Sequence, residues 1–156
     1  MAKTEVLTNH TIEDIIYLAG YIDGDGCFYC GQVNQGKRQQ FHIKLIVTSC
    51  DDISTNWIRN TFGGNEEIQS RPAKNRPYDR IVYYWVATGD LLDYLLPKLE
   101  PYLKLKKRRC QIMMELRETF KNWGKEVPEE IKEKRLQLIK EMHSKNSRFH
   151  NHPLKQ

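Results

Sequence analysis

Residues 17–26 read YLAGYIDGDG, an apolar run that contains Ala19 and Gly20 and ends on two aspartates. Apolar residues from Ile12 onward recur with the spacing of one helical face, so this run is predicted to end a helix. Glycine inside a helix costs about 1 kcal/mol relative to alanine, and a close approach of another backbone offsets that cost. The two small residues therefore predict a tight helix contact, either with the chain's own core or with a partner.

The two acids add a second constraint on this segment. Asp23 and Asp25 fall at the C-terminal end of the predicted helix, where the helix dipole disfavours negative charge. A nearby cation relieves this, and carboxylates with backbone carbonyls, such as that of Gly24, are ligands that Mg²⁺ prefers. An ordinary turn is the alternative explanation of the DGDG sequence.

Composition indicates one domain with a nucleic-acid partner. The chain has 156 residues, 39% of them apolar, and its 25 Lys and Arg against 20 Asp and Glu give a formal net charge of +5. Basic residues gather in several clusters, which favours a nucleic-acid partner, although a solvated face is the alternative for each cluster. There is no apolar run long enough for a membrane span and no secretory signal at the N-terminus. The four cysteines do not require disulfides, so an intracellular protein is expected.

The hydrophobic pattern predicts an α+β fold with the order αββαββα and further C-terminal helices. A four-stranded antiparallel or mixed sheet would carry helices on one face, and the polar residues of the other face indicate a partner there. Residues 1–143 are expected to form one domain and residues 144–156 a flexible basic tail. The predicted helices span about 11–24, 52–62, 88–96, 101–123 and 128–143, and the predicted strands lie in 27–49, 66–71 and 80–87.

Residues 18–26 closely resemble the signature of the LAGLIDADG homing endonucleases. Tyr21 and Gly24 depart from that signature, and both changes are common in the family. The order of elements and the segment PYLKLKKRR at 101–109 add to the resemblance, which covers most of the chain. The residues identical to the signature are Leu18, Ala19, Gly20, Ile22, Asp23, Asp25 and Gly26.

The resemblance implies a dimer in which two signature helices pack against each other. Leu18, Ala19, Gly20 and Asp23 are expected at that interface, with Asp23 serving structure rather than metal binding. Only one copy of the signature occurs in the chain, and cutting two DNA strands needs two sites, so a homodimer with a twofold axis follows.

The resemblance also implies the catalytic residues. Asp25 and the carbonyl of Gly24 would hold Mg²⁺, with Mn²⁺ or Ca²⁺ as substitutes for binding, and no small-molecule cofactor is expected. Lys106 matches the family's basic position. The water-organising position falls at Ser49, where many relatives carry glutamine, and the second basic position has no clear match near Ile53.

The predicted strands are suited to reading double-stranded DNA. A strand of about 10 residues spans about 33 Å, roughly one turn of B-DNA, so two subunits would cover about 20 base pairs. The alternative is that the polar residues of these strands are solvated and contact only phosphates, not bases. The expected base-reading residues are Tyr29, Gln32, Asn34, Gln40, His42, Lys44, Gln69, Arg71 and Tyr83, and the expected phosphate-binding residues are Lys37, Arg38, Lys74 and Arg76.

The expected function is a homodimeric, Mg²⁺-dependent DNA endonuclease that cuts a long pseudo-palindromic target and leaves short 3′ overhangs. The alternative is a non-cutting protein on the same scaffold, either an RNA maturase or a DNA-binding regulator. The resemblance also implies that the gene lies in an intron, either of an organelle (chloroplast or mitochondrion) or of a microbe. Cys27 and Cys30 have the spacing of half a zinc site, but in a strand they face opposite sides, so structural zinc is disfavoured.

Overall fold

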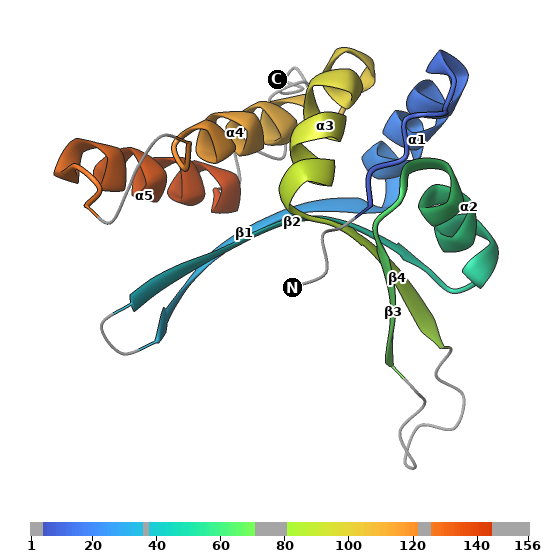
Figure 1. Cartoon of the computed structure of the whole chain (residues 1–156), viewed down its shortest axis with the longest axis horizontal. Helices are drawn as coiled ribbons and strands as arrows, with labels where there is room; N and C mark the ends of the chain where they lie inside the picture. Colours follow the sequence, from blue (N-terminus) through green and yellow to red (C-terminus); the bar gives the residue numbers. More distant parts are fainter. Residues whose placement is uncertain (1–4, 36–37, 71–80, 122–125, 145–156) are drawn as a thin grey trace, which may run out of the picture.

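The computed structural model describes residues 5–35, 38–70, 81–121 and 126–144 (Figure 1). The predicted tail, 144–156, lies outside this range except for Ser144. The helices are α1 (Ile12–Asp25), α2 (Asp52–Phe62), α3 (Gly89–Leu99), the short 3₁₀ helix η1 (Glu100–Tyr102), α4 (Lys107–Glu118) and α5 (Glu129–His143); the strands are β1 (Gly26–Gln35), β2 (Arg38–Ser49), β3 (Asn65–Ser70) and β4 (Val82–Ala87).

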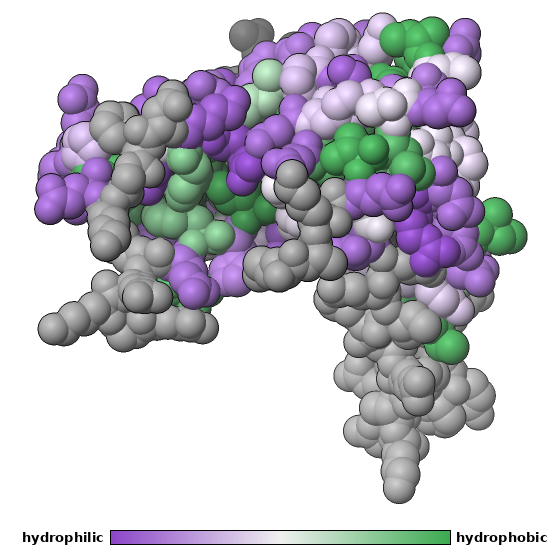
Figure 2. Space-filling model, in the orientation of Figure 1, coloured by the Kyte–Doolittle hydropathy of each residue, from purple (hydrophilic) through white to green (hydrophobic). Residues whose placement is uncertain are grey.

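The four strands form one sheet in the order β1-β2-β4-β3, and every pairing in it is antiparallel. The two hairpins bend away from each other into an arch, with the helices above it and the inner face below it uncovered (Figure 1). The predicted α+β class with a four-stranded sheet is confirmed. The visible surface of the helical layer is largely hydrophilic, with hydrophobic patches around α1 and α2 (Figure 2). None of the described helices is long and apolar enough to cross a membrane.

Helix α1 begins and ends with specific backbone contacts. Thr11 accepts a hydrogen bond from the Asp14 amide at 3.2 Å, and the Asp14 carboxylate accepts one from the Thr11 amide at 2.9 Å, which completes a capping box. At the other end Gly26 passes so close to the last turn that an added Cβ would lie 2.7 Å from the Cα of Ile22. Only glycine fits there, and the chain passes directly from α1 into β1.

The core lies between the sheet and the helices. Ile15, Leu18, Ala19 and Ile22 of α1 are buried in it together with Trp85 of β4 and the leucines of α3. The Trp85 indole donates a hydrogen bond to the carbonyl of Gly63 at 2.8 Å, so the largest core side chain leaves no polar atom unsatisfied.

Two predicted helix boundaries are wrong. The segment from Pro101 was predicted as one helix to about 123, but the structure has η1, a break, and then α4 from Lys107 to Glu118. The break exists because Asp23 binds the backbone amides of residues 104–106, which cannot then continue a helix. Helix α3 also continues through Pro97 to Leu99 instead of ending near Leu96.

Candidate active site and nucleic-acid interface

The Asp23 carboxylate connects the end of α1 to the start of α4. Its Oδ2 accepts hydrogen bonds from the amides of Lys104 at 2.7 Å and Leu105 at 3.2 Å, and its Oδ1 accepts one from the amide of Lys106 at 2.9 Å. These amides precede α4 and have no partner inside that helix. Asp23 therefore acts within its own subunit, and the expectation that it serves structure agrees with this geometry.

Lys106 supplies the cation that the C-terminus of α1 needs. Its Nζ donates hydrogen bonds to the carbonyls of Ile22 at 2.8 Å and Gly26 at 2.7 Å. Burial lowers the pKa of Lys106 below the ordinary value of 10.5, although the nearby carboxylate of Asp23 acts in the opposite direction. The position predicted to be basic thus holds a partly desolvated ammonium beside the last turn of the signature helix.

Asp25 and Gly24 lie exposed at the end of α1, next to this ammonium. The last carbonyls of a helix receive no hydrogen bond from a donor within that helix, so the Gly24 carbonyl is free of helical bonding. This carbonyl and the Asp25 carboxylate are oxygen ligands of the kind that Mg²⁺ takes. Among the described residues no group of three or more His, Cys, Asp or Glu lies close enough to hold a metal ion. A metal site at Asp25 and Gly24 therefore stays a prediction, and it would need further oxygen ligands from outside the described part of one chain.

Ser49 has a local structural role. Its hydroxyl donates to Oδ2 of Asp51 at 3.2 Å and accepts from the Asp51 amide at 3.2 Å, while Asp51 caps α2 through the amides of Ile53 and Ser54. The hydroxyl is thereby tied to the turn before α2. Ile53, near the expected second basic position, is 76% exposed and apolar.

The uncovered face of the sheet carries Tyr29 of β1 and several polar residues of β2. The register pairs Tyr29 with Lys44, while the buried pair Phe28 and Leu45 shows which face is covered by helices. Paired residues share a face, and successive residues along a strand point to opposite faces, so Tyr29, Gln40, His42 and Lys44 all lie on the open face. This face begins directly after Asp25, at the start of β1.

Comparison with known proteins agrees with this geometry. The chain is 26% identical over 137 residues to the DNA endonuclease I-CreI of Chlamydomonas reinhardtii, an alignment that covers 81% of this chain and 75% of I-CreI. The structure of the homing endonuclease I-CvuI matches with a TM-score of 0.67 and 20% identity, covering 83% of this chain and 80% of that chain. The homing endonuclease I-TnaI matches with a TM-score of 0.68 and 18% identity, covering 90% and 92%.

A third structure is longer than this chain. The LAGLIDADG homing endonuclease I-LtrWI matches with a TM-score of 0.65 and 18% identity over 92% of this chain but 48% of its own. The chain has the LAGLIDADG homing endonuclease fold. The resemblance expected from residues 18–26 is thereby confirmed. No model of a protein family matches the chain.

Within this LAGLIDADG fold, the expected interface residues separate into two groups. Leu18 and Ala19 are fully buried inside the subunit, so their side chains do not face a partner, contrary to the expectation. Helical periodicity explains this, because both residues share a face with Ile15 and Ile22. Of the other expected interface residues, Asp23 is bound within its own subunit, and Gly20 lies on the outer face, where an added Cβ would meet nothing within 4 Å. Gly24, expected as a metal ligand, is equally open.

Two expected base-reading residues, and the position of a third, lie on the helix-covered face of the sheet. Gln32 pairs with Phe41 and Asn34 with Gln39, and the hairpin register runs without a bulge, so both positions belong to the helix-covered side. Tyr83 alternates with Trp85 and also belongs to that side, while Tyr84 takes the open side. Strict alternation from Phe28 would have predicted the sides of β1, and the buried Trp85 would have predicted that of Tyr84.

The other expected DNA contacts are only partly described. Arg38 begins β2, and Gln69 falls at an irregularity of register between Ile68 and Ser70 on β3. The side chains of Arg38 and Gln69 lie outside the described part of the structure. Lys37, Arg71, Lys74 and Arg76 lie outside the described residues.

Sequence reasoning missed one neighbour of the site, Arg109, and the structure separates Cys27 from Cys30. Cys27 is exposed directly after the signature, whereas Cys30 is buried, so the two do not converge on one metal. Arg109, one turn into α4, lies close enough to Lys106 and Cys30 for its charge to lower both pKa values. Its helical spacing of three residues from Lys106 was the available signal.

Proposed function

We propose that this protein is a site-specific DNA endonuclease that hydrolyses phosphodiester bonds. The single observation that carries the proposal is the exposed Asp25 beside the Lys106 ammonium, at the edge of an open polar sheet face. I-CreI is a DNA endonuclease, I-CvuI has been observed in complex with the I-CreI target, and the archaeal intron-encoded homing endonuclease I-Vdi141I in complex with DNA.

The active form is a homodimer. The chain spans 48% of I-LtrWI and 46% of I-SmaMI, so two copies correspond to the length of either protein. One chain exposes one signature carboxylate, and its outer α1 face has the two glycines that allow another helix to approach closely. A twofold axis between two such faces brings two copies of Asp25 together at one place.

Each residue of the site has a distinct role in this proposal. Asp25 and the Gly24 carbonyl hold Mg²⁺, for which Mn²⁺ or Ca²⁺ substitutes in binding; I-CvuI has been studied with both Mg and Ca. When bound, the metal neutralises the phosphate and lowers the pKa of a water molecule that attacks it. Lys106 places a positive charge near the phosphate, and Asp23 positions Lys106 by holding its backbone amide.

The open face supplies the specificity. Tyr29, Gln40, His42 and Lys44 face the major groove, where amide and imidazole groups distinguish base edges. We assign Gln69 and Arg71 to the outer part of the site, and Lys37, Arg38, Lys74 and Arg76 to phosphates. A dimer covers about 20 base pairs of a pseudo-palindromic target and leaves short 3′ overhangs. An intron of an organelle or microbe is the proposed genetic location.

A specific observation favours a second candidate function. Ser49 is bound to Asp51, and the exposed Ile53 carries no charge, so two positions that assist catalysis in relatives are not equipped to do so here. The second candidate is a protein that binds without cutting, either an RNA maturase or a DNA-binding regulator.

The decisive experiment uses a plasmid that carries the sequence at which the protein's own intron inserts. We expect linearisation with Mg²⁺, no linearisation with EDTA, and loss of cutting in Asp25→Asn. The matched control is Asp90→Asn, because Asp90 is also an exposed acid but lies in the first turn of α3. Tight DNA binding with no cutting under any metal would contradict the endonuclease and support the regulator, and stimulation of intron splicing would support the maturase.

A further inference from the structure

The β1–β2 hairpin extends past the rest of the sheet. Strand β2 pairs with β4 only from Leu45 to Ser49, so residues 38–44 of β2 pair with β1 alone. A two-stranded ribbon is marginally stable by itself and twists more strongly than a wider sheet. The position of this distal ribbon, residues 29–35 and 38–44, therefore depends on what packs behind it.

The distal ribbon carries two of the expected base-reading residues next to a residue of the core side. Gln40 and His42 flank Phe41 in β2 and lie on the open face, whereas Phe41 faces the helices and packs against the core. The three residues share one stretch of backbone. A movement of Phe41 toward or away from the helices therefore moves both readers with it.

Phe41 rests on a side-chain cluster from two helices. Phe120, just after α4, packs edge-to-face on Phe41 with the ring centroids 5.2 Å apart. The guanidinium carbon of Arg135 lies 3.9 Å from the centroid of the Phe120 ring and 5.6 Å from that of Phe41. Arg135 belongs to α5, which lies beside α4 on the helix-covered side of the hairpin (Figure 1).

The Arg135 guanidinium is buried and held in one orientation. The residue is 6% exposed, its Nε donates to the Thr119 hydroxyl at 3.1 Å, and its Nη2 donates to the Thr119 carbonyl at 2.6 Å. Thr119 caps the C-terminus of α4, where the helix dipole favours a cation. Because the guanidinium is planar, two bonds to one residue fix its plane relative to the Phe120 ring.

This buried cation has no carboxylate partner among the described residues. Arg117, by contrast, binds both oxygens of Asp93 at 2.7 and 2.6 Å. A buried charge without an ion pair is costly, and an apolar side chain of the same size would fill the space at a lower free energy. Packing alone therefore does not account for an arginine at this position.

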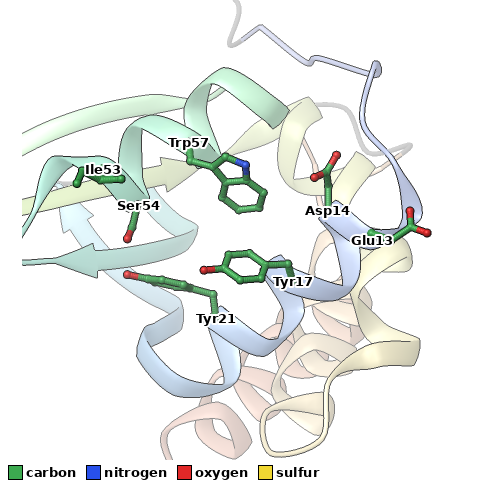
Figure 3. A pocket seen from close by; sticks show the side chains of 7 residues that line it. All are labelled: Glu13, Asp14, Tyr17, Tyr21, Ile53, Ser54 and Trp57. Carbon is green, nitrogen blue, oxygen red and sulfur yellow. The ribbon is translucent and has the colours of Figure 1, made fainter.

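Aromatic packing alone does not account for it either. Tyr17 of α1 and Trp57 of α2 also pack edge-to-face, with their centroids 5.0 Å apart, beside a groove whose lining residues include no cation (Figure 3). What Arg135 adds is direction, because its two hydrogen bonds fix the surface against which Phe120 and Phe41 pack.

A second contact of α5 holds the edge of the distal ribbon. His143, the last residue of α5, donates from Nε2 to the carbonyl of Cys30 in the edge strand β1 at 2.8 Å. Helix α5 is itself fixed to α4, since Arg108 binds both carboxylate oxygens of Glu141, at 2.8 and 3.0 Å. The helix thus supports the ribbon from behind and at its edge.

We propose that α5 supports the DNA-reading hairpin and that Arg135 is the positioning residue that sets where Gln40 and His42 enter the major groove. The inference rests on the proposed site-specific DNA endonuclease and deepens it, because it assigns part of the sequence specificity to a residue that touches no base. Arg135 acts through Phe41, on the opposite face of the strand from the two readers.

The first test measures sequence discrimination in binding. A fluorescent duplex with the intron-insertion sequence, in Ca²⁺, is titrated with protein, and each base pair is substituted in turn. Gln40→Ala and His42→Ala identify the base pairs that these side chains read, where a substitution weakens binding by about five- to 150-fold. Arg135→Met should reduce this penalty by about threefold or more at those base pairs and leave it unchanged near the cutting site.

Three further variants separate positioning from general stability. Ile58→Val removes a methyl group from a fully buried residue of α2 and should leave discrimination unchanged. Arg135→Lys keeps a cation near Phe120 and should retain more discrimination than Arg135→Met. Arg135→Met combined with Gln40→Ala should lose less than the product of the two single effects, because both act on one contact. Equal discrimination in Arg135→Met, Ile58→Val and the unmodified protein would overturn the proposal.

The second test observes the ribbon without DNA, by amide hydrogen exchange. Arg135→Met should speed exchange in residues 40–44 by about tenfold or more, while residues 45–49, paired on both sides, should change no more than in Ile58→Val. His143→Ala alters an exposed side chain, so the protein stays folded, and exchange near Cys30 should rise. Unchanged exchange in both variants would contradict the support by α5.

The outcomes separate this proposal from the proposed function. An unmodified protein that binds every duplex equally would contradict the site-specific endonuclease, whereas amide exchange would still decide whether Arg135 supports the ribbon. A protein that discriminates and cuts, but whose Arg135→Met variant discriminates equally well, would leave the endonuclease standing and remove the positioning role of Arg135.

Discussion

The inner and outer sides of helix α1 differ in burial, although the residues of both sides belong to one short motif. On the inner side, Leu18 and Ala19 are fully buried, and Asp23 is bound to three backbone amides of its own subunit. On the outer side Gly20 lies exposed, and Asp25 lies exposed at the C-terminal end of the helix. The inner side stabilises the subunit, and the outer side is available to a partner and to DNA. One short motif can therefore hold two sets of residues, which different assays report.

Helix geometry separates the two acids from each other and the two small residues from each other. Successive residues turn by about 100°, so two acids that are two positions apart point about 200° away from each other. Asp23 turns toward the loop before α4, whose amides it binds, and Asp25 lies exposed at the last turn of the helix. The same geometry separates Ala19 from Gly20, which are adjacent in sequence but lie on different sides.

Exchanging each acid for its amide should give the largest contrast between the two sides. Asp25→Asn should lower the cleavage rate by about two to three orders of magnitude and leave the free energy of unfolding unchanged. Asp23→Asn should lower the free energy of unfolding by about 2 kcal/mol, because three amides lose a charged acceptor. Plasmid cleavage and urea unfolding measure the two effects. Loss of stability in Asp25→Asn would mean that the outer acid is also structural.

Enlarging each small residue should separate folding from assembly. Ala19→Leu should destabilise the subunit by about 1–3 kcal/mol, because the site is fully buried. Gly20→Leu should stabilise the isolated subunit by up to about 1 kcal/mol, since nothing lies within 4 Å of an added Cβ, and should abolish the dimer. Thermal unfolding and sedimentation report the two properties. A dimer that persists in Gly20→Leu would exclude α1 from the interface.

Much of this division was predictable from the sequence, and the failures have physical causes. The capping box at Thr11 and Asp14, the hairpin and the caps of α2 depend on local spacing, which the sequence contains. The break before α4 depends on Asp23, about 80 positions away in the chain, so local patterns predicted an unbroken helix. The sides of Gln32 and Tyr83 are different, because they follow from strict strand alternation, which the sequence itself contains.

Lys106 joins the two sides, and its titration should affect stability. Burial lowers its pKa, so between that lowered value and 10.5 the unfolded chain binds more protons than the folded one. The free energy of unfolding should therefore rise with pH across this window relative to Lys106→Met, which has no proton to lose. Lys107→Met is the control, because Lys107 lies at the surface, 3.7 Å from Glu100. Parallel pH profiles for the unmodified protein and Lys106→Met would contradict the burial of this ammonium.

The smallest expected effect is a difference in thiol reactivity between the two faces of β1. Burial raises the pKa of Cys30 to about 11, against the opposing charge of Arg109, and raises that of Cys110 to about 12. At pH 8 a thiol with a pKa of about 11 is ionised in about one molecule in a thousand, and only the thiolate reacts. A thiol reagent should therefore label the exposed Cys27 and Cys50 quickly and the two buried cysteines only on unfolding. Because Cys27 and Cys30 differ by three positions in one strand, rapid labelling of both would show that β1 does not keep its alternation, and the assignment of Tyr29 and Lys44 to the DNA-facing side would fail with it.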